Sequence, residues 1–202
     1  MQGSYGKAHR GKEEGVTVGI SVKWDRSQIA AIGTGPLKAA AKRALRKAGS
    51  TALRDMRSEA SKRIRQRKRI KASYIRRAMT LRRPKGGDIG SMEWAVEMDA
   101  TPVPLVAYPH RQTKRGVRVE VNRGKRTVVA GSFVATMQSG HRGVFERKGP
   151  ARLPIQELRG SRPVDALLHE GESEAVAARG GASFVATLAR VLPLEVAKGK
   201  VG

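Results

Sequence analysis

The sequence has no cysteine, and other residue types that support common functions are scarce. Without thiols the chain forms neither disulfide bonds nor thiolate zinc sites, and a cysteine nucleophile is excluded. The four histidines lie far apart without ligand spacing, so we expect no metal site. No apolar run approaches the ~18 residues that span a bilayer, and the first positions are rich in Gly, Lys and Glu, where a signal peptide needs an apolar stretch. We therefore expect a soluble protein made in the cytoplasm, with no membrane partner.

Acidic and aromatic residues are also few. The 202 residues include 41 Lys or Arg but only 17 Asp or Glu, which gives a formal net charge of +24, and aromatic residues make up 4%. Such an excess of positive charge attracts polyanions, whereas a binder of single strands needs aromatic side chains on which bases stack. The range 38–85 holds 19 basic and 2 acidic residues, whereas 152–202 holds 7 basic and 6 acidic. We therefore expect a polyanion to contact the first half.

Hydrophobic periodicity in the first half predicts a strand followed by one long helix. Positions 1–15 show no periodicity and contain several glycines, so we interpret them as a flexible arm. Apolar residues alternate with polar or small ones from Val16 to Val22, as in a half-buried strand. From Leu37 to Ile64 they recur every three or four positions, which is typical of one helix face, and Ala dominates this stripe. Pro36 suits the first turn of this helix, and Gly49 in its middle indicates a close packing contact or a bend.

The remaining pattern predicts short helices and antiparallel strands. Valines alternate with charged residues over Val117 to Val121, and Asn122-Arg123-Gly124 supplies turn chemistry before Thr127 to Ala130, which predicts a hairpin. We predict an α+β fold in which a long N-terminal basic helix and shorter helices pack on a mostly antiparallel β-sheet, as a single domain over 16–202. The other expected elements are a helix over Ala72 to Leu81, strands over Met92 to Met98, Leu105 to Tyr108 and Phe133 to Met137, a helix opened by Pro163, and a helix capped by Ser183 that ends near Pro193.

No group of residues has the pattern of a catalytic or cofactor site. His141 stands near Glu146 and Arg147 and a histidine beside a carboxylate can act as a general acid or base, but Gly140-His-Arg-Gly143 has the composition of a turn. Gly33-Thr-Gly35 lacks the third glycine of the dinucleotide fingerprint, and no P-loop motif occurs. The acidic residues over 93–99 alternate in a predicted strand, which is typical of a solvated face. We therefore expect no catalytic residue, no cofactor and no metal.

The densest basic segment, at the end of the long predicted helix, is the first candidate for contact with DNA. Phosphate is the usual partner of such a density of positive charge. The alternatives are a solvated helix face and a site for acidic side chains of a neighbouring subunit. The segment contains Arg63, Arg65, Arg67, Lys68, Arg69 and Lys71.

A second basic cluster lies on the predicted hairpin and its approach. A basic hairpin tip can point into a channel filled with DNA, but a long loop in solvent explains the pattern equally, and we favour the loop slightly. The cluster contains Arg111, Lys114, Arg115, Arg118, Arg123, Lys125 and Arg126.

Three segments of the second half resemble a known family. They are Ser132-Phe-Val-Ala-Thr-Met137, Gly140-His-Arg-Gly-Val-Phe-Glu-Arg147 and Arg152-Leu-Pro-Ile-Gln-Glu-Leu158. In this order they resemble the prophage minor tail protein Z family of tailed bacteriophages, and the preceding basic helix matches the family's layout. The resemblance is strongest over Phe133 to Leu158. Proteins of this family are similar to small tail-completion and neck proteins, which assemble as rings at the head-proximal end of the tail.

The residues of this motif also have a physical interpretation. Gly140 and Gly143 permit a positive φ in a tight connection. Arg147 and Arg152 flank a Lys-Gly-Pro turn, where they either bind a carboxylate of an adjacent subunit or are exposed, and Pro154 belongs to the Pro-Ile pair of the motif. The large apolar side chains are each expected to be buried, which is worth about 1.5 to 3 kcal/mol apiece. They are Phe133, Val144, Phe145 and Ile155.

Two functions are consistent with these features. The resemblance implies a structural virion protein, a minor tail or tail-completion protein that forms a homo-oligomeric, hexameric ring at the head–tail junction, with the tail terminator and the connector as partners. The basic residues would then line the DNA passage, and the weakly charged C-terminal third would pack against neighbours. The alternative is a free nucleic-acid-binding protein whose basic helix contacts a duplex or structured RNA without sequence preference. An enzyme acting on DNA is disfavoured, because clusters of carboxylates or metal ligands are lacking.

Overall fold

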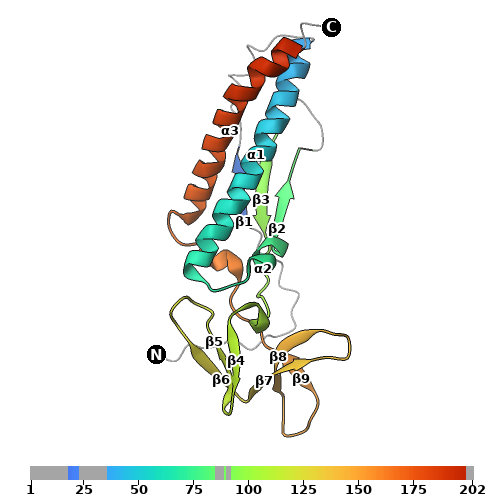
Figure 1. Cartoon of the computed structure of the whole chain (residues 1–202), viewed down its shortest axis with the longest axis vertical. Helices are drawn as coiled ribbons and strands as arrows, with labels where there is room; N and C mark the ends of the chain where they lie inside the picture. The colour runs from blue at the N-terminus through green and yellow to red at the C-terminus, as the bar shows by residue number, and fades with distance from the viewer. Residues whose placement is uncertain (1–17, 23–35, 85–88, 90–91, 199–202) are drawn as a thin grey trace.

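The chain folds into two long helices and several short antiparallel strands, an α+β arrangement (Figure 1). The computed structural model describes residues 18–22, 36–84, 89 and 92–198. The arm predicted over 1–15 and the segment Gly33-Thr-Gly35 lie outside them. The elements are β1 (Val18–Val22), α1 (Pro36–Arg67), α2 (Ala72–Arg77), β2 (Met79–Arg82), β3 (Trp94–Met98), η3 (Leu105–Ala107), β4 (His110–Thr113), β5 (Gly116–Val119), β6 (Thr127–Ala130), β7 (Ser132–Thr136), β8 (Arg142–Arg147), β9 (Ile155–Glu157), η4 (Pro163–Ala166) and α3 (Glu172–Lys198).

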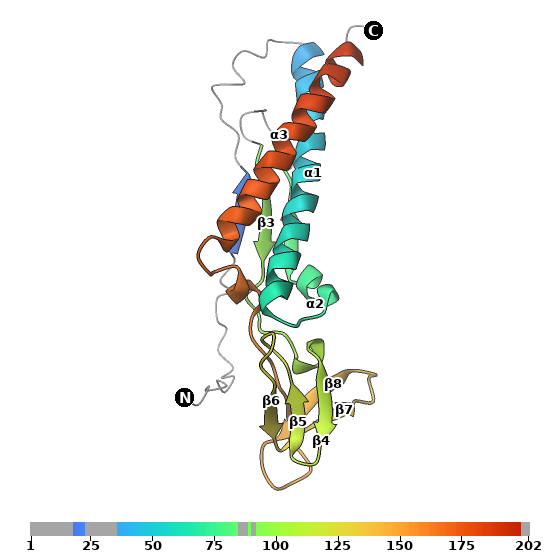
Figure 2. The ribbon, with the colours of Figure 1, turned by 60° about the vertical axis from the view of Figure 1, so that its left-hand side comes forward.

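Within the described residues the strands form three separate antiparallel sheets of three strands each, in the orders β1-β3-β2, β4-β5-β6 and β7-β8-β9. Helices α1 and α3 run side by side in opposite directions and cover the first sheet (Figures 1 and 2). The other two sheets lie beyond the C-terminal end of α1. The expectation of helices on antiparallel strands is confirmed. The strands are divided among three small sheets, however, and only the first carries the long helices.

Helix α1 confirms the long helix expected from Leu37 to Ile64. The apolar stripe is buried from Ala41 to Ile64, whereas Leu37 at its start is 41% exposed. The close contact expected at Gly49 is present, because a Cβ atom at this position would overlap the indole of Trp94 in β3. The missing side chain therefore lets the helix lie directly on the sheet.

Helix α3 corrects the expectation for the C-terminal region. It is one continuous helix, so Ser183 does not cap its start and Pro193 lies inside it. Pro163 opens only a short 3₁₀ segment, η4. Side chains on both sides of Pro193, among them Val191 and Glu195, are buried, and this packing keeps the helix intact beyond the proline. Among the described residues α3 is the one helix long and apolar enough by composition to cross a membrane, a test that core helices also pass.

Two shorter predictions were also wrong. The helix expected over Ala72 to Leu81 ends at Arg77, because Met79 and the residues after it pair with β3 as strand β2. Ile75 of α2 and Met79 of β2 are both buried. The strand expected over Leu105 to Tyr108 begins instead with the 3₁₀ turn η3, which directly follows Pro104.

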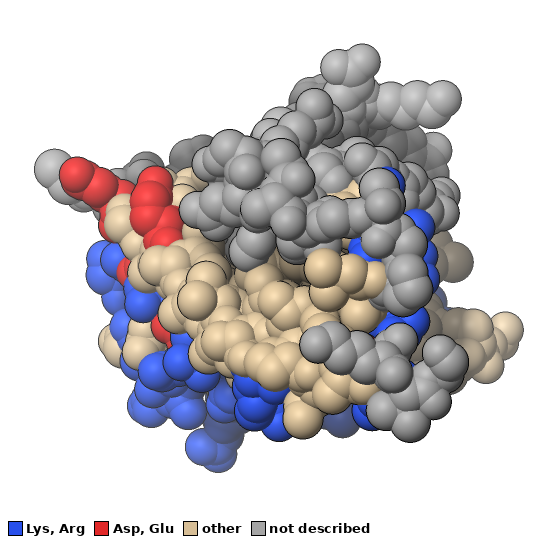
Figure 3. Space-filling model, turned by 90° about the horizontal axis from the view of Figure 1, so that it is seen from above, with Lys and Arg blue, Asp and Glu red and all other residues tan. Residues whose placement is uncertain are grey.

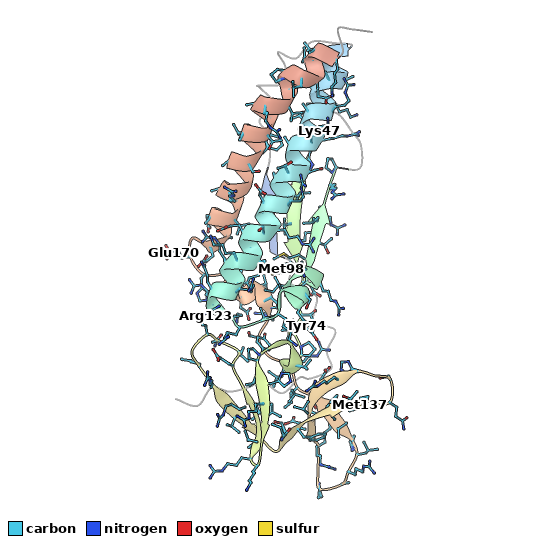
Figure 4. The ribbon with its side chains drawn as sticks, viewed as in Figure 1. Lys47, Tyr74, Met98, Arg123, Met137 and Glu170 are labelled. Atoms are coloured by element: carbon cyan, nitrogen blue, oxygen red, sulfur yellow. The ribbon has the colours of Figure 1, made fainter. Side chains whose placement is uncertain are left out.

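Glu195 links the C-terminal end of α3 to α1 through ion pairs. Its carboxylate accepts hydrogen bonds from Lys47 Nζ at 2.7 Å and from Arg43 Nε at 2.8 Å, and its side chain is only 4% exposed. Figure 4 labels Lys47 on the upper part of α1. The hydrogen bonds from Lys47 and Arg43 lower the pKa of Glu195 from 4.5 to about 2. The carboxylate therefore stays ionised over the whole neutral range.

We predict that Glu195→Gln destabilises the protein in a pH-dependent way. Because the pKa in the folded state is about 2 and the unperturbed value is 4.5, the contribution of Glu195 is complete above pH 4.5 and is lost as the pH falls towards 2. The melting temperatures of the variant and the wild type should therefore differ at neutral pH and converge near pH 2. Glu93→Gln, at an exposed position, is the control and should leave the melting temperature unchanged at both pH values. A constant gap between Glu195→Gln and wild type would contradict the prediction.

Candidate nucleic-acid interface

The two basic segments of the sequence meet in the folded protein. The end of α1 pairs with the β5–β6 turn: Arg69 N donates to Val121 O at 3.0 Å, and Arg123 N donates to Arg67 O at 2.9 Å. An isolated β-bridge between Lys68 and Asn122 lies between these two bonds. Figure 4 labels Arg123 at this junction. Backbone hydrogen bonds therefore join the end of α1 to the part of the second cluster between β5 and β6, in a surface that we call the basic junction and define as residues 63–71 with 122–126.

Glu120 is the buried acid that organises the turn of the basic junction. It is 6% exposed and accepts hydrogen bonds from Gly124 N at 3.0 Å, from Arg126 Nε at 3.3 Å and from Arg69 Nη1 at 3.4 Å. The backbone bond from Gly124 lowers the pKa of Glu120 most, and the two guanidinium groups lower it further. The turn, including Gly124 with its φ of 82°, is thereby held against the end of α1.

Glu172, the first residue of α3, balances part of the charge on α1. It accepts hydrogen bonds from Arg63 Nη1 at 2.7 Å and from Arg67 Nη2 at 2.9 Å, and Arg63 also binds Glu59 at 2.8 Å. The bonds from Arg63 and then Arg67 lower the pKa of Glu172. The two arginines therefore pair α1 with α3, and Arg63 is mostly occupied by carboxylates of its own chain.

Lys68 was expected to face DNA, but it is buried, so this prediction was wrong. Only 8% of the residue is exposed, and its Nζ donates to Ser161 Oγ at 2.7 Å. Burial lowers the pKa of its ammonium group. Ser161 also accepts, through its backbone oxygen, the hydroxyl of the buried Tyr108 at 2.9 Å, and burial raises the pKa of that tyrosine to about 12. Lys68 therefore holds the junction together from inside and does not reach solvent.

The other candidates of the basic junction reach solvent. Within the described residues, no ion pair involves Arg65, Lys71 or Lys125, so these three charges are free to meet an outside anion. Figure 3 shows the opposite end of the molecule, where α1 begins and α3 ends, with Lys and Arg along the lower rim and Asp and Glu towards the left. The exposed members of the junction are Arg65, Arg67, Arg69, Lys71, Arg123, Lys125 and Arg126.

The hairpin cluster is divided between strands and connections, so the loop interpretation holds for part of it. Arg111 lies on β4 and Arg118 on β5, whereas the other members lie in the β4–β5 turn or in the connection 120–126. The hairpin itself is confirmed, with Gly116 opposite Ala130 and Val119 opposite Thr127. A two-residue turn connects β4 to β5, and Arg111 stands directly opposite Arg118. Both arginines are exposed. Like charges directly opposite each other are destabilising.

The family-motif residues form the small sheet β7-β8-β9 and its turns. Phe145 is 5% exposed and Phe133 is half-buried, with ring centroids 6.3 Å apart, and the guanidinium of Arg147 lies 5.5 Å above the Phe133 ring. Val144 is fully buried. Ile155, expected in the core, is only half-buried, because it lies on the edge strand β9. Arg152 and Pro154 are exposed.

The two glycines of the motif have different roles. Gly140 has a φ of 78° in the turn between β7 and β8, as expected. Gly143 lies inside β8 without a positive φ, so its expected role was wrong. A Cβ there would come within 2.8 Å of Glu157 Oε1 and of the Phe145 ring, so glycine is needed for close approach. His141 pairs with that same Glu157 at 2.8 Å and not with Glu146.

No group of three or more metal-ligating side chains occurs in the described part of the chain. Sequence reasoning missed the acids that organise the basic residues, Glu120 and Glu172, as well as Ser161. Glu120 lies only 6 residues from Arg126 but 51 from Arg69, and Glu172 and Ser161 lie 105 and 93 residues from their basic partners. No local spacing signals these contacts with the end of α1. No protein-family model, curated protein or solved structure matches the chain.

Proposed function

We propose that the chain is a structural protein of a tailed bacteriophage virion, a minor tail or tail-completion protein that forms a ring around the DNA passage at the head–tail junction. The segregation of its surface carries the proposal. One side, formed by α1 and the basic junction, carries many exposed basic residues, whereas the exposed side of α3 around Val185 consists mainly of Ala and Val. A ring subunit around DNA needs both kinds of surface, one towards the duplex and one towards its neighbour.

The basic side suits contact with a DNA duplex without recognition of its base sequence. Helix α1 carries 11 basic and 2 acidic residues, and the exposed charges of the junction continue from its end. Contacts to phosphates carry no sequence information and are weakened by salt. The scarcity of aromatic side chains fits a double-stranded partner better than a single-stranded one. The proposal assigns the protein no catalytic residue and no cofactor.

The outward face of α3 supports a contact between subunits. Val185 is 62% exposed, and Ala178, Ala182 and Ala189 are exposed on the same side of the helix, at spacings of three or four residues. Small side chains let a second helix approach closely. A hexamer at the head–tail junction, with the tail terminator and the connector as partners, follows from the family resemblance.

Electron cryomicroscopy of purified virions tests the proposal. We expect a ring of this protein at the head-proximal end of the tail, with the basic junction towards the bore. A ring whose basic junction faces a neighbouring subunit would retain the virion role and exclude the DNA-facing assignment. Absence of the protein from the virion would exclude the proposal.

We predict that a charge on the outward face of α3 prevents assembly. Val185→Glu with Ala182→Glu should spare folding, because both side chains are exposed, but should bury unpaired carboxylates in the subunit contact, which costs several kcal/mol per charge. The double variant should be missing from purified particles by immunoblot. The control is Gln138→Glu with Ser139→Glu, which adds the same charge at the exposed β7–β8 turn. Normal incorporation of the Val185 and Ala182 variant would place the contact elsewhere.

The alternative function is a free nucleic-acid-binding protein. One observation favours it: the two basic segments already form a continuous surface within a single chain, through the bonds of Arg69 and Arg123. Under this alternative the isolated monomer binds a duplex with strong salt dependence, and the protein is absent from virions. Binding that requires the assembled ring would exclude it.

A further inference from the structure

A hollow of about 470 Å³ opens where the end of α1, the β5–β6 turn and the segment after η4 meet. The hollow lies within the basic junction and extends it by a third segment, which contributes His169. The lining residues are Gln66, Arg67, Lys68, Asn122, Arg123, Ala166 and His169.

The lining is rich in side chains that carry N–H groups. Six of its seven residues carry side-chain N–H groups, and none carries a carboxylate. A second hollow, between α1 and α3, gives the opposite picture, because Asp55 and Glu59 lie there among the basic residues and form ion pairs with them. The hollow of the basic junction therefore has a lining rich in N–H groups and without a carboxylate, although Lys68 already donates to Ser161.

The donors are fixed before any ligand arrives. Arg123 is anchored by its backbone nitrogen on Arg67 O at 2.9 Å and by Nη2 on Arg65 O at 2.8 Å. Arg67 is oriented by Glu172, which leaves part of its guanidinium for another acceptor. Within the described residues Arg123 pairs with no carboxylate. Guanidinium groups held in this way match the oxygens of a phosphate group.

We propose that this hollow binds a phosphate of the DNA backbone and is the point at which the basic junction contacts the duplex. This inference rests on the proposed contact with DNA and adds where that contact is made. Arg123 and Arg67 supply charge, and the amides of Gln66 and Asn122 supply neutral hydrogen bonds. A diffuse electrostatic contact with DNA would need no such neutral donors. Removing one of them without changing the net charge therefore weakens DNA binding if a phosphate occupies the hollow, and leaves it unchanged if the contact is diffuse.

Fluorescence anisotropy with a labelled DNA duplex of arbitrary sequence tests the inference on the full chain at low and moderate salt. We predict that Arg123→Gln weakens binding about tenfold, the effect of losing one charge-assisted hydrogen bond. Gln66→Ala leaves the net charge unchanged and should still weaken binding several-fold. Arg118→Gln, which removes the same charge from the outer face of β5, is the matched control and should weaken binding much less. Thermal melts establish that each variant is folded.

Equal losses for Arg123→Gln and Arg118→Gln, with no effect of Gln66→Ala, would overturn the inference and leave a diffuse electrostatic contact with DNA. No binding of the duplex by the wild-type chain would also overturn it. Microscopy of virions tests the ring independently, so failure of the hollow is distinguished from failure of the proposed function.

Discussion

Replacing Trp94 with alanine is expected to lower the free energy of unfolding by about 3 to 5 kcal/mol, the usual cost of emptying a large buried aromatic site. Trp94 is 2% exposed and lies on β3 between the two long helices. Its ring contacts the backbone of α1 at Gly49 and packs on Phe184 of α3, with ring centroids 5.6 Å apart. Small domains are stable by roughly 5 to 15 kcal/mol, so one substitution removes a large share. Urea denaturation measures the loss, and Trp94→Phe should show a smaller one.

A double-mutant cycle with Gly49 separates this contact from a general loss of packing. In the wild type, Gly49→Ala should destabilise by about 1 to 3 kcal/mol, because the new methyl group overlaps the indole. In the Trp94→Ala background the same change should stabilise by up to about 1 kcal/mol, because alanine favours the helix and the overlap is gone. The same effect of Gly49→Ala in both backgrounds would contradict the packing described here.

The second large effect is expected at Phe145, where alanine should cost about 3 to 5 kcal/mol. The ring is 5% exposed and is enclosed by Phe133, by the edge of the His141 ring with centroids 6.3 Å apart, and by the backbone of Gly143. Because the β7-β8-β9 sheet has only three strands, few other contacts compensate for the loss. Chemical denaturation followed by circular dichroism measures the change.

Phe133→Ala is the matched control for Phe145→Ala. Phe133 lies directly opposite Phe145 in the strand register but is only half-buried, under the guanidinium of Arg147. Its loss should cost clearly less. A cost below about 1 kcal/mol at Phe145 would show that the ring serves a contact with another molecule and not the core.

The helix α1 was predicted closely from the sequence, because a helix with one buried face has apolar residues at regular, short spacings along the chain. Apolar residues at every third or fourth position predicted the buried stripe from Ala41 to Ile64, and Gly49 predicted the close contact that Trp94 makes. The β5–β6 hairpin was predicted for the same reason, since alternation and the turn residues lie within a few positions of each other. Features set by neighbours in the sequence are therefore predictable from it.

Helix α3 shows where local patterns are insufficient. A proline inside a helix removes a hydrogen bond and usually ends the helix, so Pro193 predicted a boundary. The helix continues past it because Glu195, beyond the proline, is held by Lys47 and Arg43 of α1. That contact joins residues about 150 positions apart, and no sequence pattern near Pro193 indicates it.

The candidate site divides in the same way. Which residues are basic is visible in the sequence, and seven of the nine DNA-facing candidates are exposed in the fold. The sequence does not show which of these basic side chains already bind partners within the chain. Lys68 is buried on Ser161, and Arg63 is shared between Glu59 and Glu172, because of partners brought in by the tertiary structure.

The pairing of α1 with α3 has a consequence for the order in which the protein forms during translation. The residues that join their ends, Arg67 and Glu172, are 105 positions apart. At a synthesis rate of about 5 to 20 residues per second, a finished α1 waits on the order of 5 to 20 s for its partner helix. Strand β3 ends at Met98, so it is available to cover one side of α1 much earlier. We therefore expect α1 to meet the strands of the first sheet before α3, and its α3-facing side to stay uncovered until the second helix emerges.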